Sequence, residues 1–185
     1  MITGLSGAGR STAADVFEDL GWFVIDNMPL ELMPGMAELA QHDGVEADRV
    51  AFVIGATSNV AELRRMLDGF AAVGSRVRVL FLDARTDVLI RRYESTRRRH
   101  PAGAGELLSG AIEQERTLLD GMRELADVVV DTSDLNVHEL RERVDGLFGD
   151  PRDDPGMQVT VLSFGFKHGV PADVDLVLDC RFLPN

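Results

Sequence analysis

The sequence predicts an α/β fold built around a mostly parallel sheet. Along the first 148 residues, short apolar runs alternate with segments whose apolar residues recur at helical spacing, as in strands joined by crossover helices. A glycine-rich stretch follows the first apolar run and leads directly into the first helical segment. Hydrophobic residues make up 45% of the chain, a share typical of globular proteins.

Five apolar runs are expected to form the strands of this sheet. They span residues 1–3, 22–25, 49–54, 77–82 and 127–130. The fourth run has the clearest strand pattern, and the second is expected to be buried. In the order 2-3-1-4-5, which is common for such sheets, the third strand lies beside the first. The first run is shorter than the usual length of about five or six residues, so we expect the start of the chain to be truncated or mis-assigned.

Segments with apolar residues every three or four positions are expected to form the helices between these strands. They span residues 11–20, 30–41, 60–73, about 87–97, about 106–126 and 136–148. The second is expected to be interrupted, or to start, near Pro34. The stripe within 60–73 is interpreted as ordinary core. Asn136 and Glu139 have the spacing of a capping box, with asparagine in place of the usual serine or threonine.

The pattern also predicts where domains begin and end. Residues 1–148 are expected to form the first domain, and the stretch GDPRDDPG (149–156) is predicted to be a linker because it holds prolines and aspartates but no apolar residue. Two further apolar runs follow within 157–185. Because two strands without a covering helix do not make a stable domain, this segment is expected to be the start of an incomplete second α/β domain.

Composition limits the classes of function. The net charge of −12 excludes a chain that is a nucleic-acid-binding surface throughout. No run reaches the ~20 apolar residues that span a bilayer, and no signal segment precedes the glycine-rich loop, so a soluble, cytoplasmic protein is expected. Cys180 is the only cysteine, which excludes an internal disulfide, and it is interpreted as a core residue.

The glycine-rich stretch GLSGAGRS fits the phosphate-binding P-loop pattern at every position except the lysine. Its residues are Gly4, Leu5, Ser6, Gly7, Ala8, Gly9, Arg10 and Ser11. Glycines let backbone N–H groups form a concave anion site, and the following helix adds the positive end of its dipole. The loop therefore predicts ATP or GTP binding in a P-loop NTPase, kinase-like sheet with helices on both faces. The alternative is a purely structural turn.

Two positions of the loop bear on its chemistry. Ser11 is expected to complete the coordination of Mg²⁺. Arg10 carries a planar guanidinium where a compact ammonium usually lies between the phosphates, which favours binding over hydrolysis or transfer. An acid usually ends the neighbouring third strand, but Gly55 stands there. Asp26 and Asp83 end strands at the same edge and are alternatives acting through water. No catalytic residue is identified.

Five segments carry a resemblance to a known family. They are residues 4–11, 26–29, 79–101, 126–141 and 159–185, which together cover most of the chain. They resemble the RapZ/YvcJ family of P-loop nucleotide-binding proteins, and the last segment is not found in ordinary kinases. The resemblance implies ATP and GTP binding with weak hydrolysis at most. In one branch it also implies an RNA-binding adapter that senses an amino-sugar phosphate through a C-terminal domain continuing past this chain.

The chain departs from that family at the end of the third strand. The family usually has Asp-Val-Arg and a small polar residue there, assigned to guanine-nucleotide binding. The corresponding residues are Gly55, Ala56, Thr57 and Ser58. Because both charged groups are absent, this degenerate motif does not predict a preference for GTP.

Two further groups of residues have alternative interpretations. Arg97, Arg98 and Arg99, with Arg91 and Arg92 upstream, follow the fourth strand where related kinases place a phosphate-binding lid. The run also suits a solvated helix face or an RNA contact. Asp131 and Thr132 end the last strand, either near a nucleotide base or in a turn that starts the next helix.

The leading hypothesis is a regulatory nucleotide-binding protein of the RapZ/YvcJ type. A small-molecule kinase that uses the arginine-rich lid is the alternative. The RNA and sugar-phosphate contacts of the adapter hypothesis would lie mostly beyond the chain. The sequence is compatible with a homo-oligomer but does not specify one.

Overall fold

The computed structural model describes residues 1–27, 29–33, 35, 49–55, 59–72, 74–96, 107–149 and 177–179. Within these residues, five parallel strands form one sheet in the order β2-β3-β1-β4-β5. The strands are β1 (Ile2–Gly4), β2 (Phe23–Asp26), β3 (Val50–Val53), β4 (Leu80–Asp83) and β5 (Val128–Asp131). The sequence-based prediction of an α/β fold with this strand order is therefore confirmed.

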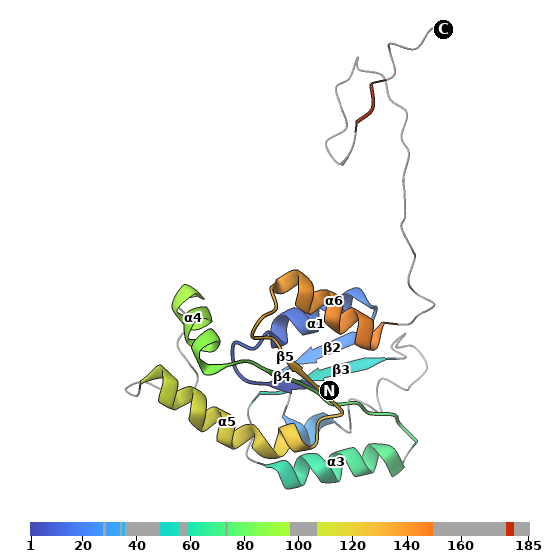
Figure 1. Cartoon of the computed structure of the whole chain (residues 1–185). Helices are drawn as coiled ribbons and strands as arrows, with labels where there is room; N and C mark the ends of the chain where they lie inside the picture. The colour runs from blue at the N-terminus through green and yellow to red at the C-terminus, as the bar shows by residue number, and fades with distance from the viewer. Residues whose placement is uncertain are drawn as a thin grey trace, which may run out of the picture. The chain divides into compact units, whose positions relative to one another are not determined.

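Helices cover both faces of the sheet (Figure 1). The helices are α1 (Arg10–Asp19), the short 3-10 helix η1 (Leu30–Leu32), α3 (Val60–Ala72), α4 (Thr86–Thr96), α5 (Leu108–Glu124) and α6 (Val137–Phe148). α1 and α6 lie together on one face, while α3 and α5 lie on the other. α4 packs against α5. All strands point the same way, so the loop after β1 and the starts of α1, α4 and α6 gather at the carboxyl edge of the sheet.

The central strands are apolar on both faces because helices cover both sides. Ile2, Leu80 and Leu82 are 0% exposed and Phe81 is 2% exposed. On the α1 face, the core continues into Phe17. Its ring packs edge-to-face against the ring of Trp22, with 5.0 Å between the ring centroids. This packing holds the strand ends, and with them the loop after β1, in fixed relative positions.

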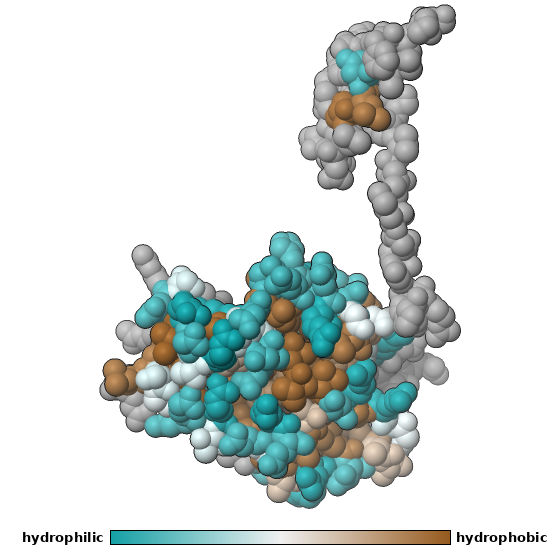
Figure 2. Space-filling view, viewed as in Figure 1, coloured by the Kyte–Doolittle hydropathy of each residue, from teal (hydrophilic) through white to brown (hydrophobic). Residues whose placement is uncertain are grey.

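Two details of the strand predictions were wrong. β2 was expected to be buried, but it is an edge strand and Phe23 is 49% exposed. β4 was expected from residue 77, but it begins at Leu80, which pairs with Ile2 in β1. Just before it, the Val79 N–H donates to the Asp127 carboxylate at 2.7 Å rather than to a strand. β5 forms the other edge, where Figure 2 shows a hydrophobic surface area.

The helix predictions hold to within a few residues, apart from the second. That segment starts as the 3-10 helix η1, and Met33 and Gly35 after it are α-helical, in keeping with a helix that starts near position 34. Residues 34 and 36–41 lie outside the described part. The Asn136 capping box is present, since its side chain accepts from the Glu139 N–H and the Glu139 side chain accepts from the Asn136 N–H.

The first compact unit of the chain is Met1–Asp150. The predicted linker after Gly149, the two strands predicted within 157–185 and Cys180 lie almost entirely outside the described residues, so their predictions stay predictions. In the described residues, no helix combines the length and apolar character required to cross a membrane.

Candidate functional site

The loop after β1 leaves the sheet at a point where β1 and β4 approach closely. Gly4 has φ 138°, and a Cβ built on it would lie 2.1 Å from the Leu82 carbonyl oxygen. Only glycine permits both the conformation and the approach. The Leu5 N–H donates to the same carbonyl at 3.0 Å. The loop therefore starts from a fixed position on the sheet.

The loop ends at the start of α1, which presents backbone donors. Gly9, at φ 103°, is the N-cap and has no side chain to accept from the helix start. The first bond of the helix runs from the Ala13 N–H to the Gly9 carbonyl at 3.0 Å. The N–H groups of Arg10, Ser11 and Thr12 thus precede the intrahelical ladder. Donors in this arrangement, with the positive end of the helix dipole, favour an anion.

A buried carboxylate holds the first part of the loop. Glu115 of α5 is 6% exposed. Its oxygens accept the Ser6 N–H at 3.1 and 3.2 Å and the Ser6 hydroxyl at 2.6 Å. Ser6 is itself 5% exposed, so these bonds lie away from solvent.

Arg92 and Thr132 hold the next two residues of the loop by their carbonyls. The Arg92 Nη1 donates to the Gly7 carbonyl at 3.1 Å, and the Thr132 hydroxyl lies 3.0 Å from the Ala8 carbonyl. Arg92 also donates to the Thr132 carbonyl at 2.7 Å, which joins α4 to the loop after β5. Burial lowers the pKa of the Arg92 guanidinium, and the charge of Asp131 partly opposes that shift.

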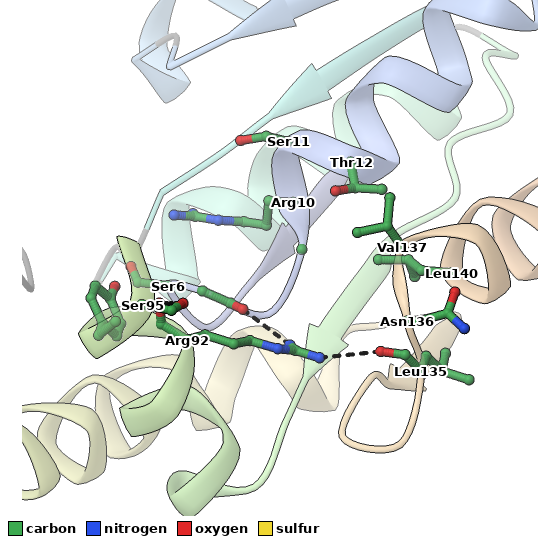
Figure 3. Close-up of a pocket in the computed structure, with 13 residues that line it drawn as sticks. Ser6, Arg10, Ser11, Thr12, Arg92, Ser95, Leu135, Asn136, Val137 and Leu140 are labelled. Atoms are coloured by element: carbon green, nitrogen blue, oxygen red, sulfur yellow. Dashed lines mark hydrogen bonds between the residues drawn. The ribbon is translucent and has the colours of Figure 1, made fainter. Parts of the chain in front are cut away.

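A cavity of about 700 Å³ opens beside the loop. Figure 3 shows its walls, which come from the loop, from the first turn of α1, from α4 and from the start of α6. The polar side carries the α1 donors and Arg92, while Leu135, Val137 and Leu140 form an apolar side. A cavity with a convergent set of polar groups and an apolar wall suits a small organic anion.

The two helix starts at this cavity differ in the donors they present. The Asn136 side chain accepts from the N–H groups of His138 at 2.8 Å and Glu139 at 3.1 Å, so α6 caps its own first turn. α1 has no such cap. The start of α1 is therefore the better anion site of the two.

Arg10 extends towards the end of β3, away from Val137 and Leu140 (Figure 3). Its Nη1 donates to the Ile54 carbonyl at 2.8 Å. A Cβ built on Gly55 would lie 3.9 Å from the same nitrogen, which is an ordinary van der Waals distance. The arginine at the lysine position is thus held by a main-chain oxygen of the sheet.

The side chains available for Mg²⁺ are few. Ser11 is exposed in the first turn of α1, where its hydroxyl suits a hard cation. Asp83, by contrast, pairs with Arg116 at 2.6 Å and with Arg123 at 3.5 Å. Asp26 ends β2, which is separated from β1 by β3. In the part of the chain that the structure describes, no group of three or more His, Cys, Asp or Glu side chains could hold a metal ion.

The remaining predicted residues lie in the turn after β5 or outside the part of the chain that the structure describes. Asp131 accepts the N–H of Ser133 at 2.8 Å and also its hydroxyl, which lowers the pKa of the Asp131 carboxyl and supports the interpretation as a turn. Thr132 faces the loop, as described above. Positions 56–58 of the degenerate motif and the arginines at 97–99 lie outside the described residues.

Sequence reasoning missed Glu115, although a signal for it exists. The buried residues of α5 are Ala111, Ile112, Glu115, Leu119 and Met122. Glu115 thus stands within an apolar stripe at helical spacing, where a charged residue is rarely buried unless it is paired. An acid in that position indicates a polar partner brought in by the fold.

The fold and the loop define the class of protein: an α/β protein with the P-loop kinase fold. Similar solved structures include shikimate kinase from Acinetobacter baumannii in complex with shikimate (TM-score 0.55, 18% identity, 79% of this chain and 89% of that one). Another is the Deinococcus radiodurans tunicamycin resistance protein (TM-score 0.51, 22% identity, 80% and 93%). At these identities the likeness concerns the fold alone.

The chain belongs to the RapZ-like family. The family model of the RapZ-like N-terminal domain matches residues 1–151, and that of the RapZ C-terminal domain matches residues 157–185. Relatives named nucleotide-binding protein are 50% identical in Parafrankia sp. (strain EAN1pec) and 51% identical in Frankia casuarinae, each over 100% of this chain. The chain spans 64% of the length of these two relatives.

Proposed function

We propose that this chain binds ATP or GTP, with the phosphates at residues 4–11. The observation that supports it most is the uncapped start of α1 beside the cavity of about 700 Å³. The relatives' name, nucleotide-binding protein, points the same way. Backbone donors can bind phosphate without a lysine side chain, so the arginine at position 10 does not remove the site.

The rest of the cavity suits the remainder of a nucleotide. The apolar side formed by Leu135, Val137 and Leu140 offers a surface for the base, and Val137 is 59% exposed. A volume of about 700 Å³ lies within the range of about 300–1,000 Å³ that small-molecule sites have. Nothing in this wall distinguishes adenine from guanine, so we propose binding of both.

The proposal favours binding with weak hydrolysis at most. Arg10 is bonded to the Ile54 carbonyl, and Gly55 provides no acid beside the loop. The Ser11 hydroxyl would hold Mg²⁺ together with phosphate oxygens and water, and the ion would neutralise phosphate charge. Because few of the described residues can position a nucleophile or stabilise developing charge, turnover is expected to be slow.

The test is equilibrium binding of ATP and GTP, with and without Mg²⁺, to the wild type, Ser11→Ala and Arg64→Ala. Arg64 is the control, because it lies on α3, on the face of the sheet opposite α1. We expect binding of both nucleotides, a Mg²⁺ enhancement that Ser11→Ala reduces, and no change in the control. Absence of nucleotide binding by folded wild type would refute the proposal. If the wild type transfers phosphate to a small acceptor, the kinase hypothesis is supported instead of binding with weak hydrolysis.

For the longer protein, we propose a cytoplasmic RNA-binding adapter role that responds to a sugar phosphate. Support comes from membership of the RapZ-like family and from the match of residues 157–185 to the RapZ C-terminal domain. RNA binding through phosphates would weaken with salt. A protein extended to the length of its relatives should therefore retain RNA at low salt and release it as salt rises. Failure to retain RNA at low salt would refute this role, and the same preparation would give the oligomeric state.

A further inference from the structure

Glu115 is the exception among the buried polar side chains that the structure describes. These are Thr3, Ser6, Glu115 and Thr132, and of them only Glu115 can ionise. A buried carboxyl needs hydrogen-bond donors to offset its lost hydration. Two of its donors belong to Ser6 in the P-loop.

The bond to Glu115 removes one loop donor from the anion site. The Ser6 N–H is directed to the carboxylate at 3.1 Å, whereas the N–H groups at the start of α1 have no side-chain cap. A negatively charged ligand would therefore bind from Gly7 onwards, and the protein itself supplies the acceptor for Ser6. Because Ser6 is 5% exposed, water cannot easily take over if that acceptor is lost.

The position of this bond matters because glycines follow it. Gly7 has φ 85° and Gly9 has φ 103°. Glycine visits many backbone conformations at little cost, so a loop of this composition holds one shape only if its neighbours are anchored. Arg92 and Thr132 anchor carbonyls of Gly7 and Ala8. Glu115 anchors the N–H side.

We propose that Glu115 is a positioning residue for nucleotide binding, which fixes the P-loop through Ser6 without touching the nucleotide. The inference rests on the proposed nucleotide site. In an anchored loop the donors are already oriented before the phosphates bind. The binding free energy is therefore not reduced by the entropy cost of ordering the loop. Without Glu115, the ligand itself must order residues 6–8 and bind beside an unpaired buried N–H.

The test compares three variants by nucleotide affinity and by unfolding. Glu115→Ala removes the acceptor, and Glu115→Gln keeps one acceptor oxygen. Arg116→Met is the matched control, because Arg116 is on the same helix and bonds Asp83 at 2.6 Å but not the loop. The Kd values are compared without Mg²⁺, so that the Asp83 carboxylate released in this control cannot contribute through the metal. We expect Glu115→Ala to raise Kd about tenfold, equivalent to about 1.4 kcal/mol. Glu115→Gln should restore Kd to within about threefold, and Arg116→Met should lower stability without changing Kd.

A second readout needs no nucleotide. Amide hydrogen exchange in the peptide covering the loop should accelerate in Glu115→Ala but not in Arg116→Met. If Glu115→Ala does not fold, Ser6→Ala removes only the hydroxyl bond of 2.6 Å, and it should raise Kd and loop exchange to a smaller degree, with Ser6→Thr restoring both. Wild type that binds nucleotide while these variants bind equally well overturns the inference. Wild type that does not bind nucleotide refutes the proposed function instead.

Discussion

Replacing Arg10 by lysine tests whether the arginine weakens the nucleotide site by its attachment to the sheet. The guanidinium donates to the Ile54 carbonyl at 2.8 Å in a partly buried position. To contact phosphate, that Nη1 must leave the carbonyl. Lysine carries a single compact ammonium on a flexible stem, which suits the space between phosphates without a planar fork.

The magnitude follows from the bond that is given up. A hydrogen bond from a charged group to a buried acceptor contributes about 1.5–3 kcal/mol net, and partial exposure reduces this to about 1 kcal/mol here. Arg10→Lys should therefore bind ATP or GTP about fivefold more tightly. The free protein should lose about 1 kcal/mol of stability, which for a domain of this size lowers Tm by about 2–4 °C.

The assay is calorimetric or fluorescence titration with Mg²⁺-ATP and Mg²⁺-GTP, alongside thermal unfolding and a sensitive phosphate-release measurement. Arg10→Gln is the control, because it removes the charge as well as the attachment and should weaken binding. An unchanged Kd for Arg10→Lys, together with the expected fall in Tm, would refute the reasoning. In that case Arg10 already binds the phosphates as well as a lysine would, or the loop is not the nucleotide site.

Three further predictions concern the structure that carries the site. Gly4→Ala should destabilise the protein by on the order of 4 kcal/mol, because its Cβ would meet the Leu82 oxygen at 2.1 Å with φ 138°. Gly69→Ala, a helical glycine with nothing within 4 Å of its Cβ, should instead stabilise by about 0.5–1 kcal/mol in the same urea unfolding experiment. Asn136→Ala should cost about 1 kcal/mol through loss of the capping box, measured by thermal unfolding, and an unchanged Tm would contradict the cap.

Most of the fold was predictable from local patterns. The positions of strands and helices follow from the alternation of apolar runs, the strand order is the one common for such sheets, and the cap at Asn136 is visible in the spacing alone. The wrong predictions concern the burial of β2 and the start of β4, both of which depend on the neighbouring segments in the folded chain. Phe23 was predicted to be buried because its run is apolar. Among the described strands, however, β2 pairs only with β3 and Phe23 is exposed. Val79 was predicted to lie in β4, but its N–H donates to the Asp127 side chain instead of to a neighbouring strand.

The site was predictable only where a contiguous motif encodes it. The loop and the start of α1 follow directly from residues 4–11. Arg92 and Glu115 reach the loop from 85 and 109 positions away in sequence, so only the folded chain shows that they bind it. The direction of Arg10 also depends on tertiary context, because its acceptor is the carbonyl of Ile54, which directly follows β3.

The substitutions at positions 10 and 55 are expected to depend on each other. A Cβ at Gly55 would lie 3.9 Å from the Arg10 Nη1, so the carboxylate of Gly55→Asp would pair with the guanidinium and hold it further from the phosphates. Alone, Gly55→Asp should therefore weaken nucleotide binding. In the Arg10→Lys background, the same aspartate lies at the end of the strand beside β1, where an acid can assist Mg²⁺ near Ser11, and it should tighten Mg²⁺-dependent binding.

A double-mutant cycle measures this coupling as the departure from additivity of the two single changes. We expect a change of sign in the effect of Gly55→Asp between the two backgrounds, seen with Mg²⁺ and reduced without it. Gly146→Asp, on the exposed side of α6 where nothing lies within 4 Å of its Cβ, adds the same charge far from Arg10 and is the control. Additive effects of positions 10 and 55 would show that the two residues act independently. The arginine would then need no partner on β3 to explain its effect on the site.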